Sequence, residues 1–282
     1  RVRGSYDPRK AHHKTYVRRK YAKYQGMKIV HHVALRHEVE WRLFDDQSPT
    51  AVARRITNRE KRLPAISKNA IYRYITSVYG RNIEAHRSRK RQRRWRKRGS
   101  QKSLSERRFI DKRPHYINER RRIGDVEADF ILSGKSGHGI VLTMADRRSR
   151  ASFIEQILNV TIANAHLAFL RIKKRFPEMR TMTTDNDLLF ERHKELERLL
   201  RIKIYFCHQY HSWEKGTIEN TNGVIRRDIP KGSDLSKYSR RFIRNLEAKL
   251  NRRPMECLKD RTPQEVLALY RKRIKRNKKH RA

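Results

Sequence analysis

The middle of the chain carries the clearest pattern of apolar and polar positions. Its strand-like runs, bounded by short turns, span 125–132, 139–145, 151–157, 180–185 and 202–207. The first three follow one another directly, which predicts an antiparallel meander. Helical spacing of apolar residues separates the later runs, over 161–176 and 188–200, and the first of these helices stops before Pro177. The pattern therefore predicts an α/β core.

Helical periodicity continues after this core. A segment around Glu219 is expected to form a helix entered from Gly216, with apolar residues available for burial. Two further helices are predicted at 239–250 and 262–274. The final stretch, 271–281, is rich in Lys and Arg and has no acidic residue, so we expect it to fray or to lie on nucleic acid.

Shorter helices are predicted in the N-terminal half. Ser48 and Pro49 mark one helix start, and Ser67 is a second N-cap, before a helix that extends to Tyr79. Short helices joined by tight turns are typical of a helix-turn-helix, whose second helix enters the major groove of DNA. The candidate DNA contacts on that helix are Lys68, Asn69, Tyr72 and Arg73. A plain three-helix bundle would show the same periodicity.

The charge of the chain favours a nucleic-acid partner. Lys and Arg number 72 against 29 Asp and Glu, a net charge of +43, which attracts a polyanion in a salt-dependent way. Tyrosines interleave with cations over 1–36, as in a base-stacking arm or in a solvated helix packed on a neighbour. The like-charge run 87–98 is predicted to be a linker along the DNA backbone. Its candidate contacts are Arg89, Arg93, Arg94 and Arg96.

Composition also limits the class of protein. The sequence has no apolar run of about 20 residues, so it predicts no membrane span. The cysteines Cys207 and Cys257 give no disulfide framework, which fits a reducing cytosol. Cys207, His208 and His211 are too few and wrongly spaced for a zinc site, so we interpret them as structural or solvent-facing. Trp213, an aromatic residue after a strand, is expected more often in a core than on a base.

Three carboxylates are the candidate catalytic groups. Asp185 ends a strand, Glu219 lies on a later helix and Asp129 lies in the first strand-like run, so the three can converge. Carboxylates gathered in so basic a chain indicate hard cations such as Mg²⁺, which takes oxygen ligands. Any one of them alone would more often be an ion-pair residue. Asp125 and Glu127 share a strand face with Asp129 and are left outside the set, with Glu127 interpreted as a surface or ion-pair residue.

Longer sequence motifs resemble those of a known protein family. The chain resembles the DDE transposases of the bacterial insertion-sequence family numbered thirty. The resemblance lies in the order of Asp129, Asp185 and Glu219 and in the motifs at 212–223 and 230–235. The core of such enzymes is similar to RNase H and retroviral integrase. The resemblance implies an RNase H-like α/β catalytic core, a mixed sheet flanked by helices. It also implies an all-α helix-turn-helix DNA-binding domain before that core.

The resemblance also implies an activity. Asp129, Asp185 and Glu219 would hold two Mg²⁺ ions about 4 Å apart, with Mn²⁺ able to substitute, for DNA cleavage and strand transfer. The substrates would be double-stranded DNA, namely terminal inverted repeats and target DNA. The protein would act as a dimer or a larger assembly on DNA, in the bacterial cytoplasm at the nucleoid. Arg226, two helical turns beyond Glu219, and Lys231 would contact this DNA.

The expected parts are a basic arm, a helix-turn-helix, a basic linker, the catalytic core and C-terminal helices with a basic tail. Their ranges are 1–36, 37–80, 81–122, 123–236 and 237–282. Family members carry a further upstream helix-turn-helix, so an N-terminally shortened chain is expected.

Asp187 stands where the family usually has Gly, which keeps open an inactive or domesticated transposase acting as a DNA-binding repressor. An RNA-binding protein would explain the charge alone, and an RNase H-like nuclease would explain the carboxylates alone.

Overall fold

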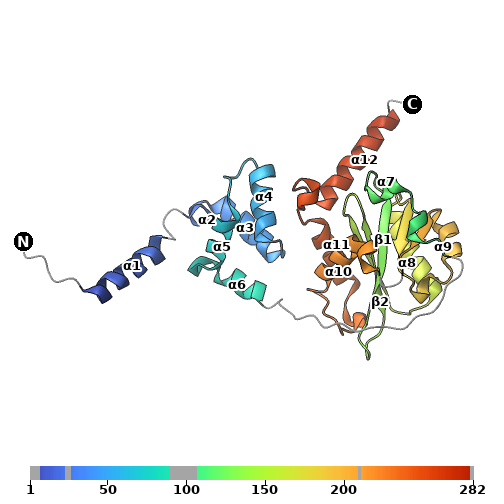
Figure 1. The fold of residues 1–282 in the computed structure, drawn as a ribbon, viewed down its shortest axis with the longest axis horizontal. Coiled ribbons are helices and arrows are strands. Elements are labelled where there is room, and N and C mark those ends of the chain that lie inside the picture. The colour runs from blue at the N-terminus through green and yellow to red at the C-terminus, as the bar shows by residue number, and fades with distance from the viewer. Residues whose placement is uncertain (1–6, 23–26, 89–106, 209–210, 280–282) are drawn as a thin grey trace, which may run out of the picture. The chain divides into compact units, whose positions relative to one another are not determined.

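The computed structural model describes residues 7–22, 27–88, 107–208 and 211–279 (Figure 1). The chain divides into two compact units, Arg1–Trp95 with Pro254–Arg261 and Arg96–Arg253 with Thr262–Ala282. Four predicted DNA contacts of the linker, Arg89, Arg93, Arg94 and Arg96, lie outside the described residues. Among the helices described, none has both the length and the apolar composition required to span a bilayer.

The first unit is built from helices. They are α1 (Pro8–Ala22), α2 (Lys28–His31), α3 (Val33–Phe44), α4 (Pro49–Arg59), α5 (Lys68–Ile75) and α6 (Arg81–Ser88). Residues from α2 to α6 share one apolar core, which includes Leu35, Val52 and Ile71. Ile29 and Ile83 lie in the same core, on either side of the predicted range 37–80. The N-terminal unit is therefore all-α, as predicted.

Two predicted helix caps are confirmed. The Ser48 hydroxyl accepts a hydrogen bond from the backbone N–H of Ala51 at 3.2 Å, and Pro49 occupies the first helical position of α4. The Ser67 hydroxyl accepts from the N–H of Ala70 at 3.2 Å and begins α5. Each cap satisfies a backbone donor that the first turn of a helix leaves without a partner.

The helix α5 ends at Ile75, four residues before the predicted end at Tyr79. The Ser77 hydroxyl accepts from the N–H of Tyr79, which starts the separate 3-10 turn η1 (Val78–Gly80). At Gly80 a Cβ atom would lie 2.2 Å from the carbonyl oxygen of Tyr74, so only glycine permits this close return of the chain. The chain then continues directly into α6.

A five-stranded mixed sheet forms the centre of the second unit. Its strands are β1 (Asp125–Leu132), β2 (Ile140–Asp146), β3 (Ser152–Ile157), β4 (Thr181–Thr184) and β5 (Lys203–Phe206). Their spatial order is β3-β2-β1-β4-β5. The pairs β1–β2 and β2–β3 are antiparallel, which confirms the meander, whereas β4 runs parallel to β1 and β5 parallel to β4. This arrangement is the RNase H-like α/β fold that was predicted.

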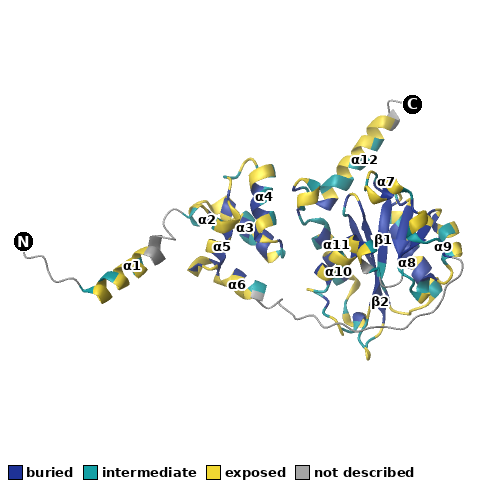
Figure 2. Cartoon of the chain, viewed as in Figure 1, coloured by how far each residue is buried: buried dark blue, intermediate teal, exposed yellow. Residues whose placement is uncertain are grey.

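Helices cover both faces of this sheet (Figure 1). The helices of this unit are α7 (His115–Asn118), α8 (Ile162–Arg175), α9 (His193–Leu200), α10 (Gly216–Ile225), α11 (Arg240–Asn251) and α12 (Pro263–Lys279). The same unit contains the short 3-10 turns η2 (Ile110–Lys112), η3 (Leu188–Phe190), η4 (Ser212–Lys215) and η5 (Leu235–Lys237), whereas η6 (Glu256–Leu258) belongs to the first unit. One apolar cluster packs α8 and α9 on one face, and a second packs α10 and α11 on the other. The strands are consequently buried on both sides (Figure 2).

The side chains of β1 point alternately to the two faces of the sheet. Val126, Ala128 and Phe130 point into the cluster with α8. Asp129 and Ile131 belong to the opposite face, because residues two apart on a strand share a side. The strand thus presents carboxylates toward the face on which α10 lies.

Two predicted elements differ from the structure. The stretch 188–200 is not one helix but the turn η3, which Asp187 caps at its start, followed by α9. The helix α12 continues to Lys279, beyond the predicted end at Ile274 and through the tail expected to fray. Arg271, within that tail, binds the carboxylate of Glu178 at 2.7 Å, which ties α12 to the body of this unit.

Candidate active site

Asp129 and Asp185 come from neighbouring parallel strands. The register pairs Glu127 of β1 with Thr183 of β4. Continuing this register by two residues sets Asp129 beside Asp185, which directly follows β4. The parallel pairing of β1 and β4 thus brings together two of the three predicted catalytic carboxylates.

The ammonium group of Lys215 lies between these two carboxylates. Its Nζ is 3.2 Å from Asp129 Oδ1 and 3.0 Å from Asp185 Oδ2. The Lys215 side chain is only 7% exposed, whereas the side chains of Asp129 and Asp185 are 24% and 45% exposed, so the ammonium group is buried beneath two carboxylates that remain partly open to solvent. Burial alone would lower the pKa of Lys215, but the charges and hydrogen bonds of the two carboxylates raise it above its usual value. The prediction from sequence missed Lys215, because one lysine among so many cations carries no recognisable pattern.

The environment of Asp129 disfavours its ionised form. The pKa of Asp129 is raised to about 6, chiefly by burial, and the neighbouring negative charge of Asp185 contributes to this increase. The positive charge of Lys215 acts in the opposite direction. The negative charge of Asp129 is therefore stabilised by a cation beside it, and Lys215 is the cation that the protein itself supplies.

The helix α10 brings the third predicted carboxylate to this side of the sheet. Asn222 of α10 donates its side-chain amide to Asp129 Oδ2 at 2.8 Å. Glu219 lies one turn earlier on α10, and residues three apart share a helix face. The Glu219 side chain is exposed, so it remains accessible to a ligand.

Glu127 anchors α10 to the sheet. One of its carboxylate oxygens accepts the backbone N–H groups of Thr217 and Ile218 at 2.8 and 2.9 Å. The other accepts a hydrogen bond from Arg147 at 2.7 Å, and the Glu127 residue is 1% exposed. A carboxylate at the first turn of a helix accepts hydrogen bonds from N–H groups that have no partner within the helix. Its negative charge also interacts favourably with the positive end of the helix dipole. Of the two roles considered for Glu127, the ion pair is confirmed and the surface position is wrong.

Oxygen atoms near Asp129 suit a hard cation. Asp185 Oδ1 and Asn222 Oδ1 are both buried without a hydrogen-bond partner among the described residues. Mg²⁺ prefers oxygen ligands, and unpartnered oxygens beside two carboxylates offer them. The donor set of Asp129, Asp185, Asn222 and Glu219 is therefore chemically suited to a divalent cation.

The loop after β4 is held by its own side chains. Asn186 accepts from Arg107 at 3.1 Å and donates to the carbonyl of Cys207 at 2.9 Å, so it ties the ends of β4 and β5 together. Asp187 has a φ of −60° and accepts from the N–H of Leu189 at 2.9 Å. This conformation does not require glycine, so the sequence departure at Asp187 is compatible with an ordered loop.

Two predicted DNA contacts lie beyond α10. Arg226 caps the C-terminus of α10, is half-buried and donates to the carbonyl of Pro230 at 3.3 Å. Burial lowers the pKa of Arg226, and the charge of Asp129 opposes this shift, which indicates that the two groups are electrostatically coupled. Lys231 is exposed.

The four predicted contacts of α5 share its outer face. Ile71, Tyr74 and Ile75 point into the core of the helical unit. The four predicted contacts are exposed; they are Lys68, Asn69, Tyr72 and Arg73. The helix therefore presents a polar and basic face of the kind that a nucleic-acid contact requires.

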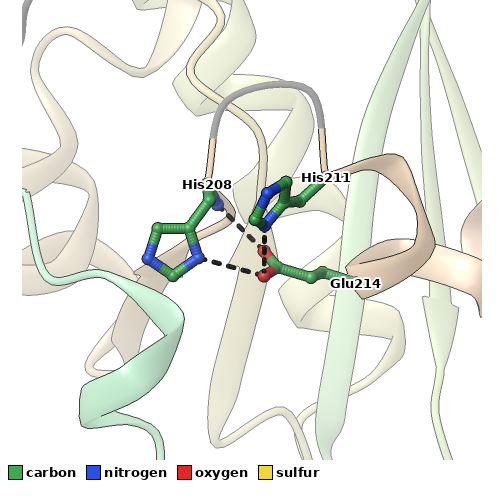
Figure 3. A group of neighbouring side chains, drawn as sticks. All are labelled: His208, His211 and Glu214. Carbon is green, nitrogen blue, oxygen red and sulfur yellow. Dashed lines mark hydrogen bonds and ion pairs between the residues drawn. The ribbon is translucent and has the colours of Figure 1, made fainter.

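A second cluster lies between β5 and α10, around the turn η4. His208, His211 and Glu214 form a group of potential metal ligands whose ligand atoms lie within 4.8 Å of one another (Figure 3). The sequence interpretation missed this group because it did not count Glu214. Trp213 is 69% exposed and stacks on His211, so the prediction that it lies in a core is wrong.

The strand order and the paired carboxylates of β1 and β4 define an RNase H-like α/β protein with an acidic site at the sheet. Sequence comparison confirms the resemblance to insertion-sequence transposases. The transposase for element IS4351 of Bacteroides fragilis is 38% identical over 214 residues, 74% of this chain and 65% of the relative. Transposase InsI for element IS30A of Escherichia coli is 33% identical over 160 residues, 56% of this chain and 41% of the relative. The chain thus spans about half the length of these relatives.

Two of the solved structures that match part of this chain are catalytic cores of retroviral integrases. The HTLV-2 integrase catalytic core domain in complex with magnesium matches 50% of this chain and 92% of that chain, with 19% identity and a TM-score of 0.38. The catalytic core domain of BIV integrase matches 54% of this chain and 98% of that chain, with 16% identity and a TM-score of 0.40. No family model matches the chain.

Proposed function

We propose that this chain is a DNA transposase that cuts DNA at the ends of a mobile element and joins those ends to target DNA. The observation that carries the proposal is the pairing of Asp129 and Asp185 through Lys215, with Glu219 on the helix above. The similarity to named insertion-sequence transposases supports the same activity. The proposed cellular place is the bacterial cytoplasm, at the nucleoid.

The proposed cofactor is Mg²⁺, two ions per site, with Mn²⁺ able to substitute. Asp129, Asp185 and Glu219 would hold these ions through carboxylate oxygens. When bound, such ions polarise the phosphodiester and make the attacking oxygen a better nucleophile.

The protein's own groups prepare the site for this chemistry. The positive charge of Lys215 between Asp129 and Asp185 offsets part of the repulsion between the two carboxylates. Asn222 fixes the orientation of Asp129. Glu127 holds the start of α10 against β1, and thereby positions the helix from which Glu219 would reach the site.

DNA binding is proposed for several basic surfaces. The exposed face of α5 would read the terminal inverted repeats as the second helix of a helix-turn-helix. The basic linker, including Arg89, Arg93, Arg94 and Arg96, would follow the phosphate backbone. Arg226 and Lys231 would hold phosphates near the carboxylates. Joining two ends requires both in one complex, so we propose a dimer or larger assembly on DNA.

The test is cleavage and joining of a DNA duplex taken from the sequence that flanks the coding region, with Mg²⁺. The variants Asp185→Asn and Glu219→Gln remove one charge each and should lower the rate at least ~100-fold, because metal ions supply several kcal/mol of transition-state stabilisation. Asp187→Asn is the matched control, since Asn also caps the turn after β4. That variant should retain activity.

Two outcomes would reject the proposal. Equal rates for Asp185→Asn and wild type would show that the carboxylates do not catalyse the reaction. DNA binding without any product, under conditions where the IS4351 transposase reacts, would favour the alternative of an inactive, DNA-binding repressor.

A further inference from the structure

The turn η4 between β5 and α10 gathers two imidazoles around one carboxylate. Glu214 Oε1 lies 3.0 Å from His208 Nδ1 and 3.3 Å from His211 Nδ1, and the two rings converge on this carboxylate (Figure 3). Glu214 Oε2 accepts the backbone N–H of His208 at 2.9 Å, which holds the carboxylate in place. The δ nitrogens of both rings thus face the same oxygen.

Neighbouring groups fix the orientation of both rings. The outer nitrogen of His208, Nε2, lies 2.8 Å from Asp111 Oδ2. The His208 ring stacks on Phe109, with a centroid separation of 5.6 Å and an interplanar angle of 9°, and the His211 ring stacks on Trp213 at 4.4 Å. A metal-binding histidine commonly donates its other N–H to a carboxylate, and Asp111 is the carboxylate that would accept this hydrogen bond from His208.

We propose that His208, His211 and Glu214 bind a divalent transition-metal ion of the zinc type. Two imidazole nitrogens and one carboxylate oxygen are the donors of many three-ligand zinc sites, which keep a fourth position open. Mg²⁺ is a poor match because it favours oxygen ligands, so this site differs chemically from the Asp129–Asp185 pair. His208 and His211 side chains are 35% and 43% exposed, which leaves an entry path for the ion.

An ion-pair cluster is the competing explanation. A protonated His208 between Glu214 and Asp111 would explain the same distances without a metal. Partly exposed ion pairs contribute little to stability, so they give little reason for both rings to face one carboxylate. Metal binding explains the shared orientation of the two δ nitrogens.

The site would influence the proposed catalytic centre through the chain. Glu214 is followed directly by Lys215, whose ammonium group bridges Asp129 and Asp185. A metal on Glu214 would hold η4 in place and with it Lys215 and the start of α10. This consequence rests on the proposed function, whereas metal binding itself does not.

The experiment is a titration of the full chain, freed of metal by chelation, with Zn²⁺ in a calorimeter and with Co²⁺ in a spectrophotometer. No DNA is present, so the result is independent of transposase activity. We expect one strong Zn²⁺ site and the visible absorption bands of tetrahedral Co²⁺. Asp185→Asn should leave both unchanged, which would separate this site from the Mg²⁺ site.

Two variants test the assignment. His211→Ala removes a ligand and should weaken Zn²⁺ binding at least ~100-fold, while Asp111→Asn removes the carboxylate behind His208 and should weaken it ~10–100-fold. Asp111 has a 71% exposed side chain, so that variant should fold normally. His115→Ala, at an 83% exposed histidine outside the cluster, is the control and should bind like wild type. Absence of a strong site in wild type, or equal affinity in His211→Ala and wild type, would overturn the proposal.

Discussion

The buried carboxylate of Glu127 connects β1 to the helix that carries Glu219, and the substitution Glu127→Gln tests this connection. The side chain keeps its size, but one oxygen becomes an NH₂ group. In the wild type both oxygens accept hydrogen bonds, one from Arg147 and the other from the N–H groups of Thr217 and Ile218. Whichever way the amide is turned, its NH₂ group therefore faces a donor.

The magnitude follows from burial. Glu127 is 1% exposed and the side chain of Arg147 is 7% exposed, so the substitution leaves a buried guanidinium without its counter-charge. Removing one partner of a buried ion pair costs about 3–5 kcal/mol. We expect the free energy of unfolding of the α/β unit to fall by about 3 kcal/mol. At about 1.4 kcal/mol per factor of ten, the amides at the start of α10 should exchange with solvent ~100-fold faster.

Urea denaturation measures the loss in the free energy of unfolding. Hydrogen exchange of the peptide covering 216–225 measures the faster exchange of the amides at the start of α10. Glu119→Gln is the matched control: Glu119 pairs with His115 and Arg121, and its side chain is 33% exposed. A surface pair of this kind contributes at most about 1 kcal/mol. If Glu127→Gln lost no more stability than Glu119→Gln, or left the exchange of α10 unchanged, the anchoring role of Glu127 would be refuted.

Three further changes test other parts of the structure. Lys215→Met should lower the melting temperature in the absence of metal, because its two carboxylate partners then repel each other, and Mg²⁺ should stabilise this variant more than wild type; an equal effect of Mg²⁺ on both would contradict the bridging role. Ser67→Ala should reduce the stability of the helical unit by about 1 kcal/mol in thermal unfolding, because α5 loses its N-cap, and an unchanged unfolding curve would contradict it. Iodoacetamide should label the exposed Cys257 in the native protein but not Cys207, since Cys207 is 2% exposed and burial raises the pKa of its thiol to about 12; equal labelling before denaturation would show that this burial is wrong.

Local sequence pattern was sufficient for most elements. The alternation in β1 and the caps at Ser48 and Ser67 depend on residues only a few positions apart, so they could be predicted directly. The errors lie where a side chain redirects the chain: Ser77 starts a separate turn after α5, and Asp187 does the same before α9. Periodicity of apolar residues does not detect such local capping bonds.

Only part of the acidic site could be predicted from the sequence. Asp129 and Asp185 could be predicted as site residues, because they lie in or directly after predicted strands and within motifs of the resembling family. Lys215 could not, because it lies 86 residues from Asp129 in sequence and reaches it only when α10 packs against β1. The tertiary structure alone decided that this lysine is buried between two carboxylates.

The same distinction holds for Glu127 and for the histidine cluster. The sequence determined that Glu127 shares a strand face with Asp129, but its partners on α10 are 90 residues away. His208 and Glu214 are close in sequence, yet their convergence requires the turn η4, and Asp111 joins them from a distant segment. Sequence thus determined which residues can form strands, helices and caps, because those depend on neighbouring positions. The pairing of charges was decided by the packing of distant elements, because electrostatic partners are set by proximity in space.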